Sequence, residues 1–272
     1  MVNVNQGLIT GANAMSSSLM GKVDSSVVNS DDGIFVLNPN NNRDLKLINS
    51  LNVKERQLLK PYFKNSDVKH YYCNKNNKYF VVYTGKEKLD EEEYPHIIAH
   101  FKKFEKITKS RKEIEPKELS MYCLHRPRVE SIFTSKKIVM PYRSQINGFA
   151  LNETPWYFST DCYCLTLKEG SKYSLEYILG ILNSTIYKTW FAKRGKMKGN
   201  TFEFMYNNLC VTPIIILNDN DIKRVEELVN IINENVKDGD VDPKTLNEYK
   251  EIDDIIRKQI DSGEIIKEKI FD

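Results

Sequence analysis

One short segment carries three side chains that can form paired hydrogen bonds with bases. In PYRSQING, Arg143, Gln145 and Asn147 occupy alternate positions after Pro141. If the segment is extended, alternate side chains point the same way. Arginine then matches guanine O6 and N7, and glutamine or asparagine matches adenine N6 and N7. The spacing predicts base readout from one face of a strand, and a polar surface loop is the alternative.

A second arginine pair lies a few residues earlier, in HRPR. Arg126 and Arg128 flank Pro127. Because a residue that precedes proline avoids the helical region, this stretch is predicted to be extended. Both guanidinium groups would then project from one face. We expect them to take part in base readout.

A basic cluster without any acid follows an amphipathic helix, in KRGKMKGN. It contains Lys193, Arg194, Lys196 and Lys198, interspersed with two glycines. Lysine and arginine neutralise phosphates, and glycine lets the backbone approach a phosphate closely. The cluster predicts a phosphate-binding surface, and a solvated basic loop is the alternative.

Other candidates are better explained as solvated or core residues. The expected helix over 96–112 has a basic face, for which we favour simple solvation over DNA contact: Lys102, Lys103, Lys106, Lys109, Arg111 and Lys112. Tyr157 could stack on a displaced base, but a place in the core is favoured. His96 and His100 have helical metal-pair spacing without a third ligand. The five scattered cysteines are predicted to be reduced thiols in the core. Cys162 and Cys164 alternate along an expected strand, so they would share one face of it.

The distribution of charge is uneven along the chain. The net charge is +3. Residues 219–272 hold nine basic and sixteen acidic side chains, whereas the preceding residues hold 31 basic and 21 acidic ones. A basic body with an acidic end is compatible with a phosphate-binding surface. Hydrophobic residues make up 40% and mean hydropathy is −0.50, as in globular proteins. No apolar run is long enough for a membrane span and no signal-peptide pattern is present, so we expect a cytoplasmic protein.

The hydrophobic periodicity predicts an α+β fold, with mixed strands, amphipathic helices and a C-terminal helical extension. We expect an irregular connector over 1–32, a recognition body over 33–218 and the extension over 219–272. Within these, helices are predicted at 47–63, 94–119, 174–195, 219–239 and 244–263, a hairpin at 70–84, and strands within 137–167.

Catalytic motifs are missing from the sequence. Methyl transfer from S-adenosylmethionine needs a glycine-rich turn between strand and helix, and adenine N6 methylation needs an Asn-Pro-Pro-Tyr type of loop. Neither occurs, nor does a phosphate-binding lysine loop. Asp161 follows a predicted strand and is interpreted as a turn or capping aspartate, with a catalytic carboxylate as the less favoured alternative. The chain alone is therefore not expected to be an enzyme or to bind a cofactor.

Long ordered strings resemble one family. The stretches 123–167 and 177–214 resemble the TaqI-like C-terminal specificity domain of type IIG restriction–modification enzymes and adenine-N6 DNA methyltransferases. Segments at 7–15, 33–37, 55–72, 79–84 and 94–111 match it in order, so the resemblance covers roughly residues 5–217. It implies recognition of double-stranded DNA as the target recognition domain of such an enzyme.

The resemblance also implies partners outside this chain. S-adenosylmethionine would be the cofactor of the intact enzyme, held by a methyltransferase domain that acts in cis or in trans. The chain would be an excised part of that enzyme, which we favour, or a separate specificity subunit. A protein-interaction scaffold is the third reading. The end of the chain, 256–272, lacks the Leu-Tyr-Gly-Leu-like turn that is frequent in the family.

Overall fold

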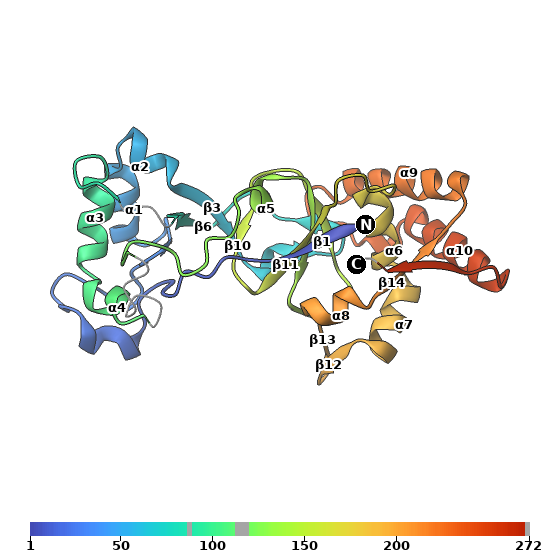
Figure 1. Ribbon diagram of the computed structural model, residues 1–272, viewed down its shortest axis with the longest axis horizontal. Helices are drawn as coiled ribbons and strands as arrows, with labels where there is room; N and C mark the ends of the chain where they lie inside the picture. Colours follow the sequence, from blue (N-terminus) through green and yellow to red (C-terminus); the bar gives the residue numbers. More distant parts are fainter. Residues whose placement is uncertain (86–88, 112–119, 270–272) are drawn as a thin grey trace.

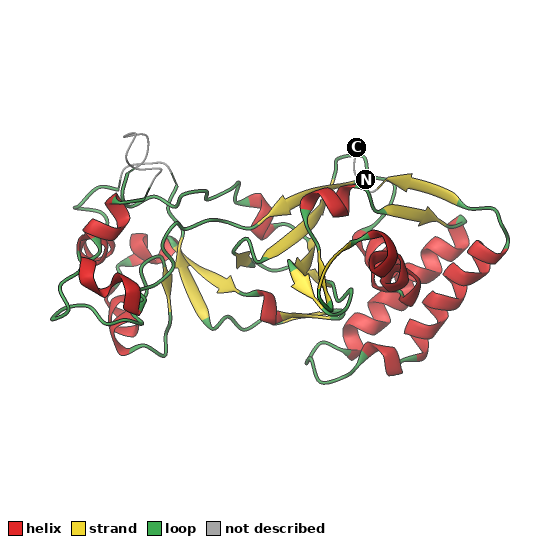
Figure 2. Ribbon diagram, turned by 90° about the horizontal axis from the view of Figure 1, so that it is seen from below, coloured by secondary structure: helices red, strands yellow, loops and turns green. Residues whose placement is uncertain are grey.

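The computed structural model describes residues 1–85, 89–111 and 120–269. The α+β fold class is confirmed: strands fill the middle of an elongated molecule, and helices gather at both ends (Figures 1 and 2). The α-helices are α1 (Asn42–Ser50), α2 (Val53–Gln57), α3 (Pro95–Lys102), α4 (Glu105–Lys109), α5 (Ser131–Thr134), α6 (Leu175–Asn183), α7 (Thr185–Arg194), α8 (Tyr206–Cys210), α9 (Asp219–Asn235) and α10 (Asn247–Asp261). Short 3-10 helices lie at Ser17–Lys22, Asn65–Asp67 and Pro243–Thr245.

The strands form several small sheets. They are β1 (Val2–Gln6), β2 (Val36–Leu37), β3 (Leu59–Phe63), β4 (Val68–Lys69), β5 (Tyr72–Cys73), β6 (Tyr79–Val82), β7 (Lys137–Pro141), β8 (Arg143–Ser144), β9 (Ala150–Asn152), β10 (Tyr157–Phe158), β11 (Cys162–Leu167), β12 (Lys196–Lys198), β13 (Thr201–Glu203), β14 (Pro213–Ile216) and β15 (Ile266–Lys269). The central sheet has the order β1-β11-β7-β9 and is antiparallel throughout. A second sheet has the order β10-β3-β6-β2.

The central sheet separates two hydrophobic cores. Along β11, Cys162 and Cys164 point into the core with the second sheet. Tyr163 and Leu165 point into the core with α6. This alternation follows from the two-residue period of a strand. The predicted common face of the two cysteines is thereby confirmed, and all five cysteines are free thiols.

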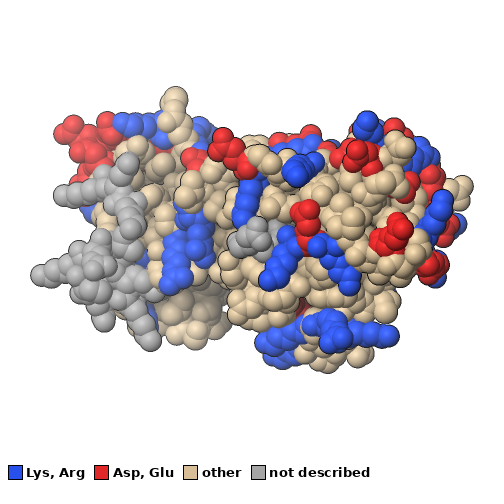
Figure 3. Space-filling model, turned by 45° about the vertical axis from the view of Figure 1, so that its right-hand side comes forward, with Lys and Arg blue, Asp and Glu red and all other residues tan. Residues whose placement is uncertain are grey.

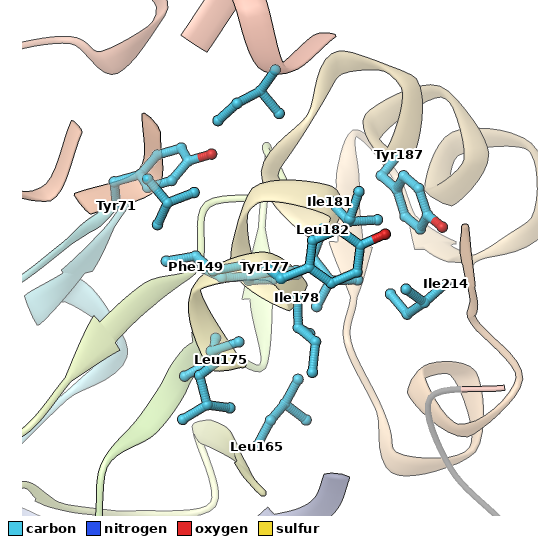
Figure 4. Close-up of a cluster of buried hydrophobic side chains, with 14 of the residues drawn as sticks. Tyr71, Phe149, Leu165, Leu175, Tyr177, Ile178, Ile181, Leu182, Tyr187 and Ile214 are labelled. Atoms are coloured by element: carbon cyan, nitrogen blue, oxygen red, sulfur yellow. The ribbon is translucent and has the colours of Figure 1, made fainter. Parts of the chain in front are cut away.

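Helix α6 lies at the centre of the core that also contains Tyr163 and Leu165 (Figure 4). The Tyr177 hydroxyl donates to the Ile215 carbonyl (2.6 Å) and accepts from the Leu217 amide (3.2 Å), which ties α6 to the segment around β14. A Cβ on Gly180 would lie 2.7 Å from a Val225 methyl, so α6 and α9 pack very closely. The C-terminal helices thus share a core with the body, and β15 pairs with β14. The domain boundaries at residues 32 and 218 stay predictions.

Three predicted helices are shorter than their periodicity suggests. The helix expected over 47–63 ends early, because Asn52 caps the separate helix α2 and Leu59–Phe63 pairs as β3 with β6 and β10. The helix expected over 174–195 is split at Ser184, whose hydroxyl accepts from the Tyr187 amide and caps α7. The helix expected over 94–119 is divided into α3 and α4, and its part at 112–119 lies outside the described residues.

Two further segments differ from expectation. The predicted hairpin over 70–84 does not form, because β5 pairs with β4 whereas β6 pairs with β2 and β3. The irregular connector begins with a regular strand, since β1 pairs with β11 from Val2↔Leu167 to Gln6↔Tyr163. Val2 is fully buried in the core. For β6 and for β1, the choice of partner strand therefore follows the burial of apolar side chains and not the nearby turn residues.

Candidate nucleic-acid interface

The second half of the basic cluster, Lys196 and Lys198, lies in a β-hairpin rather than in a loop. Strands β12 and β13 are antiparallel, and Lys198 pairs with Thr201 across a two-residue turn. Gly199 in this turn has a φ of 59°, a left-handed conformation that favours glycine. Strand β8 pairs with the other side of β13, so the sheet order is β12-β13-β8. The hairpin lies at the lower edge of the molecule in Figure 1.

This small sheet joins the two segments that sequence analysis singled out separately. Glu203 lies opposite Lys196 on one side and opposite Arg143 on the other. Directly opposed residues of an antiparallel sheet share a face. The Arg143 guanidinium donates through Nε (2.9 Å) and Nη2 (2.7 Å) to Glu203 Oε1, and Lys196 Nζ lies 3.1 Å from Oε2. We call Lys196, Glu203 and Arg143 the charged row.

Burial differs sharply within the charged row. The Glu203 side chain is only 4% exposed, whereas Arg143 is 44% and Lys196 is 55% exposed. The hydrogen bonds from Lys196 and Arg143 hold the pKa of Glu203 below its usual value. The bond to Glu203 raises the pKa of Arg143. The Arg143 guanidinium also lies over the Tyr142 ring, 4.9 Å from its centroid. Glu203 therefore holds one edge of the Arg143 guanidinium, and the Tyr142 ring covers one of its faces.

The remaining basic residues extend the positive surface beside the row. Lys193 and Arg194 form the last turn of α7, and Lys198 ends β12. All three are exposed. Within the described part of the chain, no carboxylate lies within 4 Å of any of them. Lys and Arg gather at the bottom of the face shown in Figure 3, where Figure 1 places β12 and β13. The geometry suits contact with a chain of phosphates.

The expected alternation after Arg143 holds for only two of the three side chains. Gln145 is exposed, two residues after Arg143. Asn147 is buried, and its amide donates to the Leu182 carbonyl (2.7 Å) and the Ser184 carbonyl (2.9 Å). The expected orientation of Asn147 is therefore wrong. The reason is that the two carbonyls at the α6–α7 junction need a buried donor, and Asn147 supplies it.

The arginines of HRPR do not project from one extended face. Arg128 has a φ of 66°, so the chain turns at this residue. Its guanidinium donates to the Gly7 carbonyl and the Gln6 side chain, both at 3.2 Å. Arg126 is exposed, and its backbone pairs with Ile9. This corrects the expected common face: Arg128 holds the N-terminal segment, and only Arg126 presents its side chain to solvent.

The side chains of the other candidates take part in the packing and hydrogen bonding of the fold. Arg111 is buried and donates to three backbone carbonyls, among them that of Thr10 (2.8 Å), so it is not on the basic face of α3 and α4. Lys112 lies outside the described residues. Tyr157 is buried in the core, as favoured. The His100 ring bonds the Ile34 carbonyl and His96 bonds Glu55. Among the residues described, no group of three or more possible metal ligands occurs.

Sequence reasoning missed Glu203. A pattern that could have indicated it is the sequence TFEF directly after a glycine–asparagine turn. In such a hairpin Thr201 and Glu203 alternate with Phe202 and Phe204, which are buried. The position of the acid opposite Lys196 follows from the two-residue turn. Its position opposite Arg143 does not follow, because β8 comes from a distant part of the chain.

Comparison with known proteins agrees with this architecture. The model of the family described as the TaqI-like C-terminal specificity domain matches residues 60–214. The chain is 23% identical over 256 residues to the type II methyltransferase M.MjaIV of Methanocaldococcus jannaschii, covering 90% of this chain and 80% of that protein. It is 28% identical over 197 residues to the type II methyltransferase M.HincII of Haemophilus influenzae, covering 67% of this chain and 36% of that protein.

A solved structure has the same fold. The type IIL restriction–modification enzyme MmeI, solved in complex with DNA, superposes with a TM-score of 0.61 at 15% identity, over 96% of this chain and 32% of MmeI. The chain thus spans about a third of MmeI and of M.HincII. The fold and the family match define a specificity domain related to type II methyltransferases. The chain belongs to the TaqI-like C-terminal specificity domain family. None of the helices described is long and apolar enough to cross a membrane.

Proposed function

We propose that this chain recognises a specific sequence in double-stranded DNA as the target recognition domain of an adenine-N6 methyltransferase or a type IIG restriction–modification enzyme. The observation that carries the proposal is the β12-β13-β8 sheet. It brings the exposed Arg143, next to the exposed Gln145, beside the basic hairpin, so that donors for base edges and cations for phosphates share one surface. A DNA complex of a protein with this fold supports the proposal.

In the intact enzyme, the domain would hold DNA against the methyltransferase domain while the target adenine is flipped into the catalytic pocket. S-adenosylmethionine would bind to that domain and supply the methyl group. The relation to type II methyltransferases supports this assignment. The methyltransferase domain would act in cis, or in trans if the chain is a separate specificity subunit.

The base-reading role of Arg143 and Gln145 is tested by alanine substitution. In the enzyme reconstituted with its methyltransferase domain, Arg143→Ala or Gln145→Ala should relax the methylated sequence at one position. Loss of one bidentate base contact should cost about 1–3 kcal/mol of discrimination, with nonspecific DNA binding nearly unchanged. Sequencing of methylated sites is the measurement. Asn147→Ala is a contrasting variant, since loss of its buried bonds should lower stability. A methylation motif that stays intact in both surface variants would assign base recognition to other residues.

We also expect the chain alone to bind no S-adenosylmethionine and to transfer no methyl group, since the cofactor turn and the catalytic loop are missing from its sequence. Titration calorimetry with S-adenosylmethionine is the measurement. Binding in the low micromolar range would contradict the assignment. DNA binding that is absent, or insensitive to salt, would instead favour a protein-interaction scaffold.

A further inference from the structure

The charged row constrains which edge of the Arg143 guanidinium is available to a ligand. The group has five N–H donors, and the bonds to Glu203 use the Nε donor and one Nη2 donor. The outer edge, formed by Nη1 and the second Nη2 donor, is not used by Glu203. This edge presents two parallel donors, the arrangement that matches guanine O6 and N7.

Glu203 is suited to fix this edge in place. It is a short, buried anchor on the middle strand of the sheet, and Lys196 binds its second oxygen. The Tyr142 ring lies under the guanidinium, which restricts rotation about the remaining bonds. A long arginine side chain otherwise loses rotamer freedom when it binds. Here part of that ordering is done before any ligand binds, so the contact made by Arg143 costs less conformational entropy.

We propose that Glu203 is a positioning residue that presents the outer edge of Arg143 to a guanine in the major groove, so that the recognised sequence contains a G·C pair read by Arg143. This inference rests on the proposed function and adds to it the chemical identity of one recognised base. Glu203 acts through Arg143 and does not touch the base.

The same geometry separates two effects of Glu203. Its negative charge lowers the attraction of the row for any phosphate, since it offsets one of two positive charges. Its bonds to Arg143 orient one base contact. Glutamine in place of Glu203 removes the negative charge and keeps a single acceptor oxygen, for which Arg143 and Lys196 then compete. This replacement should therefore strengthen nonspecific binding and weaken, without abolishing, discrimination at one base pair. A residue that merely supports the fold would change both in the same direction.

The test uses the 272-residue chain and a duplex library in which each position of the preferred site is varied. Arg143→Ala should lose about 5- to 150-fold discrimination at one G·C pair. Glu203→Gln should lose about 2- to 12-fold at the same pair, the equivalent of ordering one side chain. In the Arg143→Ala background, Glu203→Gln should cause no further loss. Glu169→Gln, which removes an exposed carboxylate elsewhere, is the matched control.

Base chemistry supplies a second readout. Duplexes with 7-deazaguanine at that position lack N7, so they should bind the unmodified chain more weakly and the Arg143→Ala variant equally well. Full discrimination in Glu203→Gln, or an equal loss in both backgrounds, would overturn the positioning role while leaving DNA recognition in place. A chain without salt-dependent binding to duplex DNA would overturn the proposed function and this inference together.

Discussion

Neutralising Lys193, Arg194, Lys196 and Lys198 together is expected to flatten the salt dependence of duplex binding by up to about 3.6 units of slope, the value for four side chains that each meet one phosphate. Each phosphate contact releases counterions and contributes about −0.9 to the slope of log affinity against log salt. Affinity at 50 mM salt should then fall far more than affinity at 200 mM salt. Fluorescence anisotropy over this salt range is the measurement.

The four positions are not equivalent. Lys196 shares Glu203 with Arg143, so Lys196→Gln alone should change the slope least. The matched control is a fourfold glutamine variant of the lysines on α3, α4 and the turn between them, Lys102, Lys103, Lys106 and Lys109. Lys102 and Lys109 are already paired with Glu91 and Glu105. If this control flattened the slope and the hairpin variant did not, the phosphate surface would lie on α3 and α4.

Acid is expected to destabilise the fold between about pH 6.5 and pH 4, through two buried histidines. Burial lowers the pKa of His70 to about 4 and that of His100 to about 4. A depressed histidine pKa means that the unfolded chain binds a proton more readily than the folded chain. The stabilisation is therefore complete above pH 6.5 and is lost as pH falls toward 4. Each histidine should contribute roughly 3 kcal/mol to this loss.

Urea unfolding at several pH values measures the effect. His100→Gln keeps a donor for the Ile34 carbonyl, and His70→Gln keeps one for the Asn183 carbonyl. Each variant should therefore remain folded near neutral pH and lose less stability than the natural protein on acidification. His125→Gln serves as the control, because His125 is only half-buried. Equal pH dependence in all four proteins would show that other groups govern acid unfolding.

Local patterns predicted most of the helical segments and the strands of 137–167, because amphipathic periodicity is a property of neighbouring residues. They misplaced the ends. Ser184 interrupts a continuous apolar stripe because its hydroxyl caps α7, an effect that hydrophobicity does not encode. The pairing of β6 with β2 and β3 was also missed. Strand partners far apart in sequence are chosen by shared burial, and a single sequence does not reveal them.

The candidate site was predicted in separate pieces. Charge alone indicated Lys193 to Lys198, and residue type indicated Arg143 and Gln145. The pairing of β8 with β13 unites them, and that contact joins residues 60 positions apart. Asn147 and Arg128 were assigned to base readout from their side-chain chemistry, yet both donate hydrogen bonds to backbone carbonyls within the fold. A polar side chain near an arginine is thus a weak indicator of readout until its own hydrogen-bond partners are known.

The sheet that separates the two cores has a consequence for how the molecule folds. Alternate residues of β7 and β11 complete opposite cores: Val139 and Cys164 face one, and Met140 and Leu165 face the other. Removal of either end of the molecule would therefore expose the apolar side chains on one face of the central sheet to solvent. A slip of one residue in β11 would exchange the two sets of side chains and damage both cores at once. Because both cores depend on the central sheet, we expect loss of packing at one end to destabilise the other end as well.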